Sequence, residues 1–208
     1  MIKVVTGVRR CGKSTLFLQF IDELRAEGIH VDQIIYINLE DLTNEELLDY
    51  HKLDKHISDR LIEKGISYVF LDEVQRCVGF EKVVDSLHLR KNIDVYITGS
   101  NSKLLSGELA TLLSGRYVQI EMLPLSFSEF LSSCDPTEPV RESFNRYVTF
   151  GSFPYLTQLP KDASIYNTYL EGIYNTILIK DVAGREGISD VSLLEDITRF
   201  LSSNIGSP

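Results

Sequence analysis

The chain has 208 residues, of which 43% are hydrophobic and 25% charged, close to the average for soluble globular proteins. This length fits one large domain or a core with a small appended domain, and the composition disfavours intrinsic disorder, collagen and a short disulfide scaffold. The formal net charge of -9 at pH 7 disfavours a dedicated nucleic-acid binder, because contacts with phosphates dominate that kind of affinity.

The first 124 residues alternate short β-prone runs with helical patterns. A strand is predicted at 2–6, followed by a glycine-rich turn and a helix from Ser14 to about Gly28. Thr43 and Glu46 have the spacing of a capping box at the start of a helix. Further strands are predicted at 34–38, 68–71, 95–98 and 117–120, and further helices around 44–50, 54–64 and 80–90. This alternation predicts an α/β fold in which a parallel sheet lies between two layers of helices.

After Pro124 the pattern changes to helical periodicity. Ser126 and Glu129 repeat the capping-box spacing, and helices are predicted at 140–150, 163–180 and 191–203. We therefore expect two domains, an α/β core at 1–124 and a helical extension at 125–208.

Residues 7–14 match the phosphate-binding pattern GxxxxGK[ST] between a predicted strand and a predicted helix, as the mechanism requires. The glycines let the backbone wrap around phosphates, whose charge is favoured by the N–H groups at the helix start. Lys13 would reach the β- and γ-phosphates, and Ser14 would bind Mg²⁺. The alternative is a glycine turn that binds no nucleotide. The candidate binding residues are Gly7, Val8, Arg9, Arg10, Cys11, Gly12, Lys13, Ser14 and Thr15.

The run Tyr68–Leu71 is an apolar strand that leads into two adjacent carboxylates, Asp72 and Glu73. Open α/β sheets place their ligands at the carboxyl edge of the strands, where this pair is expected. Asp72 would hold Mg²⁺ or its water shell, and Glu73 would orient and deprotonate an attacking water. A turn or a helix cap is the alternative explanation for the pair.

Two further positions are candidates for chemistry. Ser100 and Asn101 follow the strand at 95–98, where a polar side chain could position a lytic water; a turn that caps the next helix explains them equally well. Arg116 stands immediately before the last strand, where it could project toward the phosphates of a neighbouring subunit as an arginine finger. A surface salt bridge is the alternative role for Arg116.

The three cysteines are widely separated and form no CxxC pair, which favours a reducing, cytoplasmic setting over a disulfide framework or a zinc site. No apolar run approaches the roughly 18 residues needed to span a bilayer. Met1 directly precedes an apparent core strand, and the chain ends directly after a helical pattern. We therefore expect a fragment of a longer protein.

The combination of GVRRCGKST, YVFLDE, YITGSNSKLL, SGRY and LPLSFSEF closely resembles bacterial and archaeal AAA+ ATPases. In these proteins the core is followed by a helical region and, in full-length members, a carboxy-terminal domain of poorly understood character. The resemblance implies a P-loop NTPase three-layer sandwich with a parallel five-stranded sheet in the order 5-1-4-3-2 and a small all-helical lid. It also implies ATP and Mg²⁺ as the bound groups.

Carried to this sequence, the resemblance places the Walker A motif on 7–15 and the Walker B motif on Asp72 and Glu73. It places the sensor-1 position on Ser100 or Asn101 and the finger on Arg116. Within 151–154, Pro154 is similar to the proline of a lid motif that packs near adenine.

Two features depart from the family pattern. They are the segment that normally precedes the first strand and most of the carboxy-terminal domain, both of which we expect to be missing from this sequence. In addition, no arginine is assigned as sensor 2, although Arg146, Arg185 and Arg199 are available. The resemblance favours an ATP-hydrolysing protein that self-associates through Arg116. A nucleotide-gated switch with little turnover and a DNA-associated ATPase remain alternatives, with a protein or DNA partner bound through the missing domain and no membrane partner.

Overall fold

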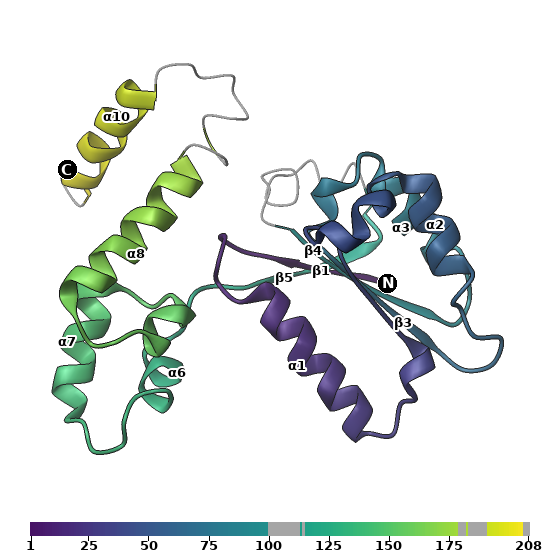
Figure 1. The fold of residues 1–208 in the computed structure, drawn as a ribbon, viewed down its shortest axis with the longest axis horizontal. Helices are drawn as coiled ribbons and strands as arrows, with labels where there is room; N and C mark the ends of the chain where they lie inside the picture. The colour runs from purple at the N-terminus through teal and green to yellow at the C-terminus, as the bar shows by residue number, and fades with distance from the viewer. Residues whose placement is uncertain (100–112, 114, 179–181, 183–190, 206–208) are drawn as a thin grey trace. The chain divides into compact units, whose positions relative to one another are not determined.

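The computed structural model describes residues 1–99, 113, 115–178, 182 and 191–205, and the chain divides into two compact units, Met1–Pro124 and Leu125–Pro208. In the described part of the first unit, helices lie on both faces of a sheet, whereas the described part of the second unit is helical (Figure 1). None of the described helices is both long enough and apolar enough to traverse a bilayer.

The sheet of the first unit has five parallel strands in the order β2-β3-β4-β1-β5, which confirms the predicted order. The inner strand β3 is buried at nearly every position, because a parallel sheet with helices on both faces leaves its inner strands no exposed side. The strands are β1 (Ile2–Thr6), β2 (Ile34–Asn38), β3 (Ser67–Asp72), β4 (Ile93–Thr98) and β5 (Tyr117–Glu121).

The helices of the first unit cover the sheet through two hydrophobic clusters. One cluster joins Phe17, Ile21 and Leu24 of α1 (Lys13–Ala26) to the sheet, and Phe17 meets Phe70 of β3 edge to face at 5.2 Å. The other cluster joins the buried side chains of α2 (Tyr50–Ser58) and α3 (Phe80–His88) to the opposite face. Because each buried large side chain contributes about 1.5–3 kcal/mol, these clusters hold the three layers together. Short 3-10 helices lie at η1 (Val31–Gln33), η2 (Leu42–Leu48) and η3 (Val74–Arg76).

The segment between β2 and β3 differs from the prediction. The helix expected at 44–50 is the 3-10 helix η2, and the helix expected at 54–64 is α2, which ends at Ser58. Asp41, and not Thr43, caps η2, since its carboxylate accepts the Thr43 N–H at 2.9 Å. Asp49 caps α2 in the same way, so the two aspartates fix the helix starts two and four residues earlier than the periodicity indicates.

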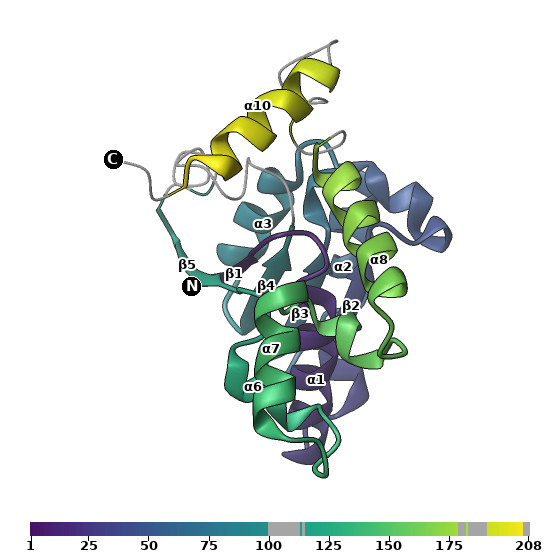
Figure 2. The same cartoon turned by 90° about the vertical axis from the view of Figure 1, so that its left-hand side faces the viewer.

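The second unit contains four described α-helices and one 3-10 helix. The predicted capping box is confirmed, because Ser126 and Glu129 exchange hydrogen bonds at the start of α6. Helices α6 and α7 lie side by side (Figure 2), and Arg146 of α7 forms a bidentate ion pair with Glu138. Pro154 is the first residue of η4. The elements are α6 (Phe127–Ser132), α7 (Val140–Phe150), η4 (Pro154–Gln158), α8 (Ala163–Thr176) and α10 (Val191–Ser203).

Candidate nucleotide-binding site

The loop between β1 and α1 begins at a position that only glycine fits. Gly7 has φ 151°, and a Cβ atom there would lie 2.2 Å from the Met122 carbonyl oxygen. That part of the backbone is fixed, because the Met122 N–H donates to the Thr6 carbonyl at 2.8 Å. The sequence after β5 therefore forms one wall of the predicted phosphate loop.

The loop ends at the N-terminus of α1, which is built to receive an anion. Gly12 caps the helix in the left-handed region with φ 105°, and the first turn contains no acidic residue and no side-chain cap. The N–H groups at this end therefore face no carboxylate from the first turn of α1, and the helix dipole favours a negative charge there. Arg10 also has a positive φ, so the loop is held in a conformation that most residues avoid.

Lys13 is the strongest electrostatic feature of the loop. Its side chain is 5% exposed, and its ammonium donates to the carbonyl oxygens of Gly7 and Val8, each at 3.1 Å. Among the described residues no carboxylate pairs with it. A buried ammonium held only by neutral carbonyls at an anion-binding helix end fits a phosphate.

Cys11 connects the loop electrostatically with Glu73. Burial raises the pKa of the Cys11 thiol, while the Lys13 charge opposes the shift and the Glu73 charge adds to it. The thiol therefore lies within electrostatic range of both the phosphate loop and the end of β3.

Asp72, the last residue of β3, is fully buried, and neighbouring strands hold both of its carboxylate oxygens. Thr98, at the end of β4, donates its hydroxyl to Oδ1, and Tyr36 of β2 donates its hydroxyl to Oδ2 at 3.2 Å. The Thr98 hydroxyl also accepts the Glu73 N–H at 3.2 Å. Burial and the Asp72 charge raise the pKa of Tyr36, which keeps its hydroxyl protonated as a donor.

Glu73 follows in an uncommon backbone conformation, with φ 55° and ψ 47°. Its half-buried carboxylate accepts a hydrogen bond from the Gln75 amide of η3. The left-handed turn at Glu73 separates its side chain from the strand that positions Asp72, so the two adjacent carboxylates have different surroundings.

The donor set also fits Mg²⁺. A carboxylate has about four lone-pair positions, and Asp72 uses two of them for Tyr36 and Thr98. Ser14, in the first turn of α1, is partly exposed and can offer its hydroxyl oxygen. Oxygen donors of this kind are the ligands that Mg²⁺ takes, usually with several waters retained.

The remaining predicted site residues are exposed or partly exposed, lie outside the described residues, or belong to the second unit. Val8, Arg10 and Thr15 are exposed and Arg9 is partly exposed. Ser100 and Asn101 lie outside the described residues. Pro154 belongs to the second unit, and its adenine contact stays a prediction.

Arg116 lies at the edge of the sheet opposite the phosphate loop. It precedes β5, whose first residue pairs with Ile2 at the start of parallel β1, whereas the loop follows the end of β1. Its backbone is anchored by hydrogen bonds to Leu113 at 3.0 Å and Ile2 at 3.1 Å, but its side chain is exposed. Within the described part of the chain the guanidinium makes no hydrogen bond or ion pair.

Sequence reasoning did not identify Tyr36, Gln75 or Met122 as part of the site. Tyr36 lies in an apolar run where an aromatic residue is typical of any strand. The feature that could have identified Tyr36 is its hydroxyl group, because Tyr36 lies two residues before the end of β2 and β2 pairs with β3, the strand of Asp72. Met122 contributes only its backbone carbonyl, which no residue type indicates.

These features define a P-loop nucleotide-binding fold: a parallel sheet, a glycine loop leading into a helix, a buried lysine and a carboxylate at the same edge. Residues 1–131 match the model of the family described as AAA domain, and the chain belongs to this family of the AAA+ superfamily.

Two relatives and one solved structure are similar to this chain. It is 39% identical over 209 residues to an uncharacterized protein of Haemophilus influenzae, covering 99% of this chain and 52% of that protein. It is 33% identical over 217 residues to the uncharacterized protein MJ1544 of Methanocaldococcus jannaschii, covering 96% of this chain and 46% of the relative. The chain thus spans about half the length of these curated relatives. The structure of C. elegans PCH-2 has a similar fold, with TM-score 0.53, 16% identity and coverage of 85% of this chain and 61% of that one.

Proposed function

We propose that this chain binds ATP with Mg²⁺ and hydrolyses it to ADP and phosphate, coupling the nucleotide state to a change of conformation. The observation that carries the proposal is the buried Lys13 ammonium, which has no carboxylate partner among the described residues and lies at the open N-terminus of α1. Asp72 and Glu73 support it, since they lie at the end of the parallel strand β3, at the same edge of the sheet.

Each residue has a distinct role in this proposal. Lys13 and the loop N–H groups bind the β- and γ-phosphates, and Ser14 and Asp72 hold Mg²⁺. When bound, the metal neutralises charge that develops on the phosphate oxygens. Glu73 accepts a proton from the attacking water, whose oxygen bonds to the γ-phosphorus as the bond to ADP breaks.

Binding is tested first by thermal melting with and without ATP and Mg²⁺. A ligand at a hundredfold excess over its Kd adds about 2.7 kcal/mol, which for a chain of this size corresponds to about 5–10 °C in Tm. Lys13→Ala should lose most of this rise, and Lys52→Ala, an exposed lysine on α2, should retain it. An equal rise in the Lys13 variant contradicts the phosphate role.

Turnover is tested separately by phosphate release. Glu73→Gln should keep the nucleotide-induced rise in Tm and lose about 10²–10⁴-fold in hydrolysis, because an amide cannot accept the proton of the water. Glu81→Gln, at a half-buried position on α3, is the matched control. Equal hydrolysis by the wild type and the Glu73 variant contradicts the base role.

A nucleotide-gated switch with little turnover is the second candidate. It is favoured by the contact of the Glu73 carboxylate with the Gln75 amide, which occupies one of the two oxygens that could accept the proton of the water. A wild-type protein that binds ATP tightly but releases no phosphate would establish this alternative.

We also propose that Arg116 completes the site of a neighbouring subunit. Its exposed guanidinium lies at the sheet edge opposite its own phosphate loop, too far away to serve its own nucleotide. Arg116→Ala should bind ATP normally and lose hydrolysis, and mixing it with Glu73→Gln should partly restore activity. Hydrolysis that is independent of protein concentration, with no recovery on mixing, contradicts this role.

A further inference from the structure

Tyr36 reaches the end of β3 from the neighbouring strand. The register pairs Tyr36 with Phe70, so Asp72 is its diagonal neighbour two residues further along β3 and on the same face of the sheet. Diagonal neighbours lie within reach of a long aromatic side chain. The Tyr36 hydroxyl covers this distance and donates to Asp72 Oδ2 at 3.2 Å.

The hydrogen bond from Tyr36 is one half of a clamp on Asp72. The Thr98 hydroxyl holds Oδ1 from β4, and the Tyr36 hydroxyl holds Oδ2 from β2. Since each oxygen is held from a different strand, the carboxylate of the fully buried Asp72 cannot rotate without breaking a hydrogen bond. Partners of this kind orient metal ligands, and their loss typically costs 10–100-fold in metal affinity or activity.

We propose that Tyr36 is a positioning residue that fixes the Asp72 carboxylate in the orientation that binds Mg²⁺ with the nucleotide. This inference rests on the function proposed above. Tyr36 acts through Asp72 and touches neither phosphate nor water in the reaction.

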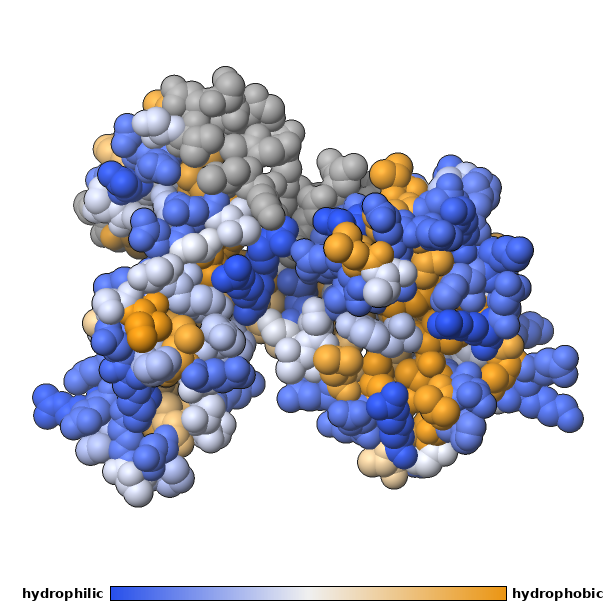
Figure 3. All heavy atoms as spheres, in the orientation of Figure 1, coloured by the Kyte–Doolittle hydropathy of each residue, from blue (hydrophilic) through white to orange (hydrophobic). Residues whose placement is uncertain are grey.

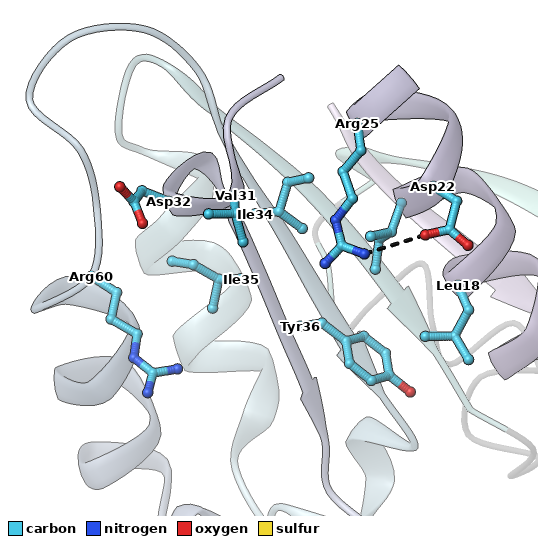
Figure 4. Close-up of a pocket in the computed structure, with 10 residues that line it drawn as sticks. Leu18, Asp22, Arg25, Val31, Asp32, Ile34, Ile35, Tyr36 and Arg60 are labelled. Carbon is cyan, nitrogen blue, oxygen red and sulfur yellow. Dashed lines mark hydrogen bonds and ion pairs between the residues drawn. The ribbon is translucent and has the colours of Figure 1, made fainter. Parts of the chain in front are cut away.

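The surroundings of the ring make the hydroxyl separable from the fold. The ring packs against the α1 cluster and lines an open groove of about 730 Å³ between α1, β2 and the end of α2 (Figure 4). Figure 3 shows hydrophobic residues exposed on one face of the first unit. Leu18 and Val31, which line the groove, are exposed hydrophobic residues. Tyr36→Phe therefore keeps the ring in a wall that is already partly open and removes only the hydroxyl.

The sheet provides a matched control at Tyr96. The Tyr96 hydroxyl donates to Asp94 Oδ2 at 2.8 Å, its ring is half-buried, and its pKa is raised by burial, as for Tyr36. Tyr96→Phe removes the same kind of hydrogen bond from the same sheet, near the start of β4 and away from Asp72.

The test titrates Mg²⁺ at a fixed, saturating concentration of ADP and follows the rise in Tm. Tyr36→Phe should need at least about 10-fold more Mg²⁺ than wild type for half of the effect, and should bind metal-free ADP normally. Tyr96→Phe should match wild type in both. In the Asp72→Asn background, Tyr36→Phe should cause no further change, because the two residues act through one carboxylate.

The outcomes separate the two proposals. If wild type shows no Mg²⁺-dependent stabilisation by ADP, the proposed function fails and this inference fails with it. If wild type responds and Tyr36→Phe follows the same Mg²⁺ curve, only the inference is overturned. An equal shift in Tyr36→Phe and Tyr96→Phe, or a further shift in the Asp72→Asn background, also overturns it, since both results indicate a general structural effect.

Discussion

Gly7→Ala is the substitution whose cost the structure determines most directly. The added Cβ would lie 2.2 Å from the Met122 carbonyl oxygen and 2.9 Å from the Cys11 sulfur, whereas real Cβ contacts start near 3.0 Å. The Met122 carbonyl would have to move by roughly 0.8 Å, against a peptide that is tied to Thr6 by a 2.8 Å hydrogen bond. Overpacking of this kind costs about 1–3 kcal/mol, and the strained φ of 151° adds about 1–3 kcal/mol.

The expected loss of about 2–6 kcal/mol is a large share of a total stability of about 5–15 kcal/mol. Gly28→Ala is the matched control, because Gly28 also has a positive φ, 91°, but a Cβ there meets nothing within 4 Å. It should lose only the conformational part, about 1–3 kcal/mol.

The assay is urea denaturation without nucleotide, followed by circular dichroism. The difference between the two variants then reports the clash of the added Cβ with Met122 and Cys11. If Gly7→Ala loses no more free energy of unfolding than Gly28→Ala, the β5 end does not form a rigid wall of the loop and the reasoning is wrong.

Three further predictions concern other contacts. The Arg146 guanidinium lowers the pKa of Glu138 from 4.5 to about 2, so the stabilisation that this ion pair provides is complete above pH 4.5 and is lost as pH falls toward 2. The Tm of wild type should therefore fall more steeply between pH 4.5 and pH 2 than the Tm of Glu138→Gln. Gln75→Ala should raise phosphate release by about 10- to 100-fold with ATP affinity unchanged, since one hydrogen bond to a charged group is worth about 1.5–3 kcal/mol; unchanged turnover would show that this contact does not restrain Glu73. Burial raises the pKa of Cys11, so iodoacetamide followed by peptide mass mapping should find it modified slowly in the folded protein and rapidly in urea.

The sheet and the phosphate loop could be predicted because their signals are local in the sequence. Apolar runs such as 68–71 indicate strands buried on both faces, and the Gly7–Thr15 motif places the loop between a strand and a helix. The order of the strands came from the family resemblance, and the structure confirms it. Local patterns failed where two caps competed, since both Asp41 and Thr43 suit a helix start and only the fold selects Asp41.

The contacts around Asp72 could not be read from the sequence, because they depend on register and backbone conformation. Tyr36 meets Asp72 only through the pairing of β2 with β3, and one residue of slip would turn its ring to the other face. The left-handed conformation of Glu73 has no signal in its residue type, since glutamate is not favoured there. The motif therefore identifies the two carboxylates, and the structure adds how each of them is oriented.

Lys13 and Asp72 together predict how the site responds to each ligand. Both are buried, and within the described part of the chain the ammonium of Lys13 has only carbonyl partners and the carboxylate of Asp72 only hydroxyl partners. Burial of an unpaired charge is costly, so each half of the site gains from an opposite charge. Metal-free ATP supplies only the anion, and Mg²⁺ alone supplies only the cation and no bridge between the halves. We expect ATP with Mg²⁺ to raise Tm by more than the sum of the two separate rises, and Asp72→Asn to remove the excess while keeping the response to metal-free ATP. Melts with ATP, Mg²⁺, both and neither measure the excess directly, and strictly additive rises would show that the two halves bind independently.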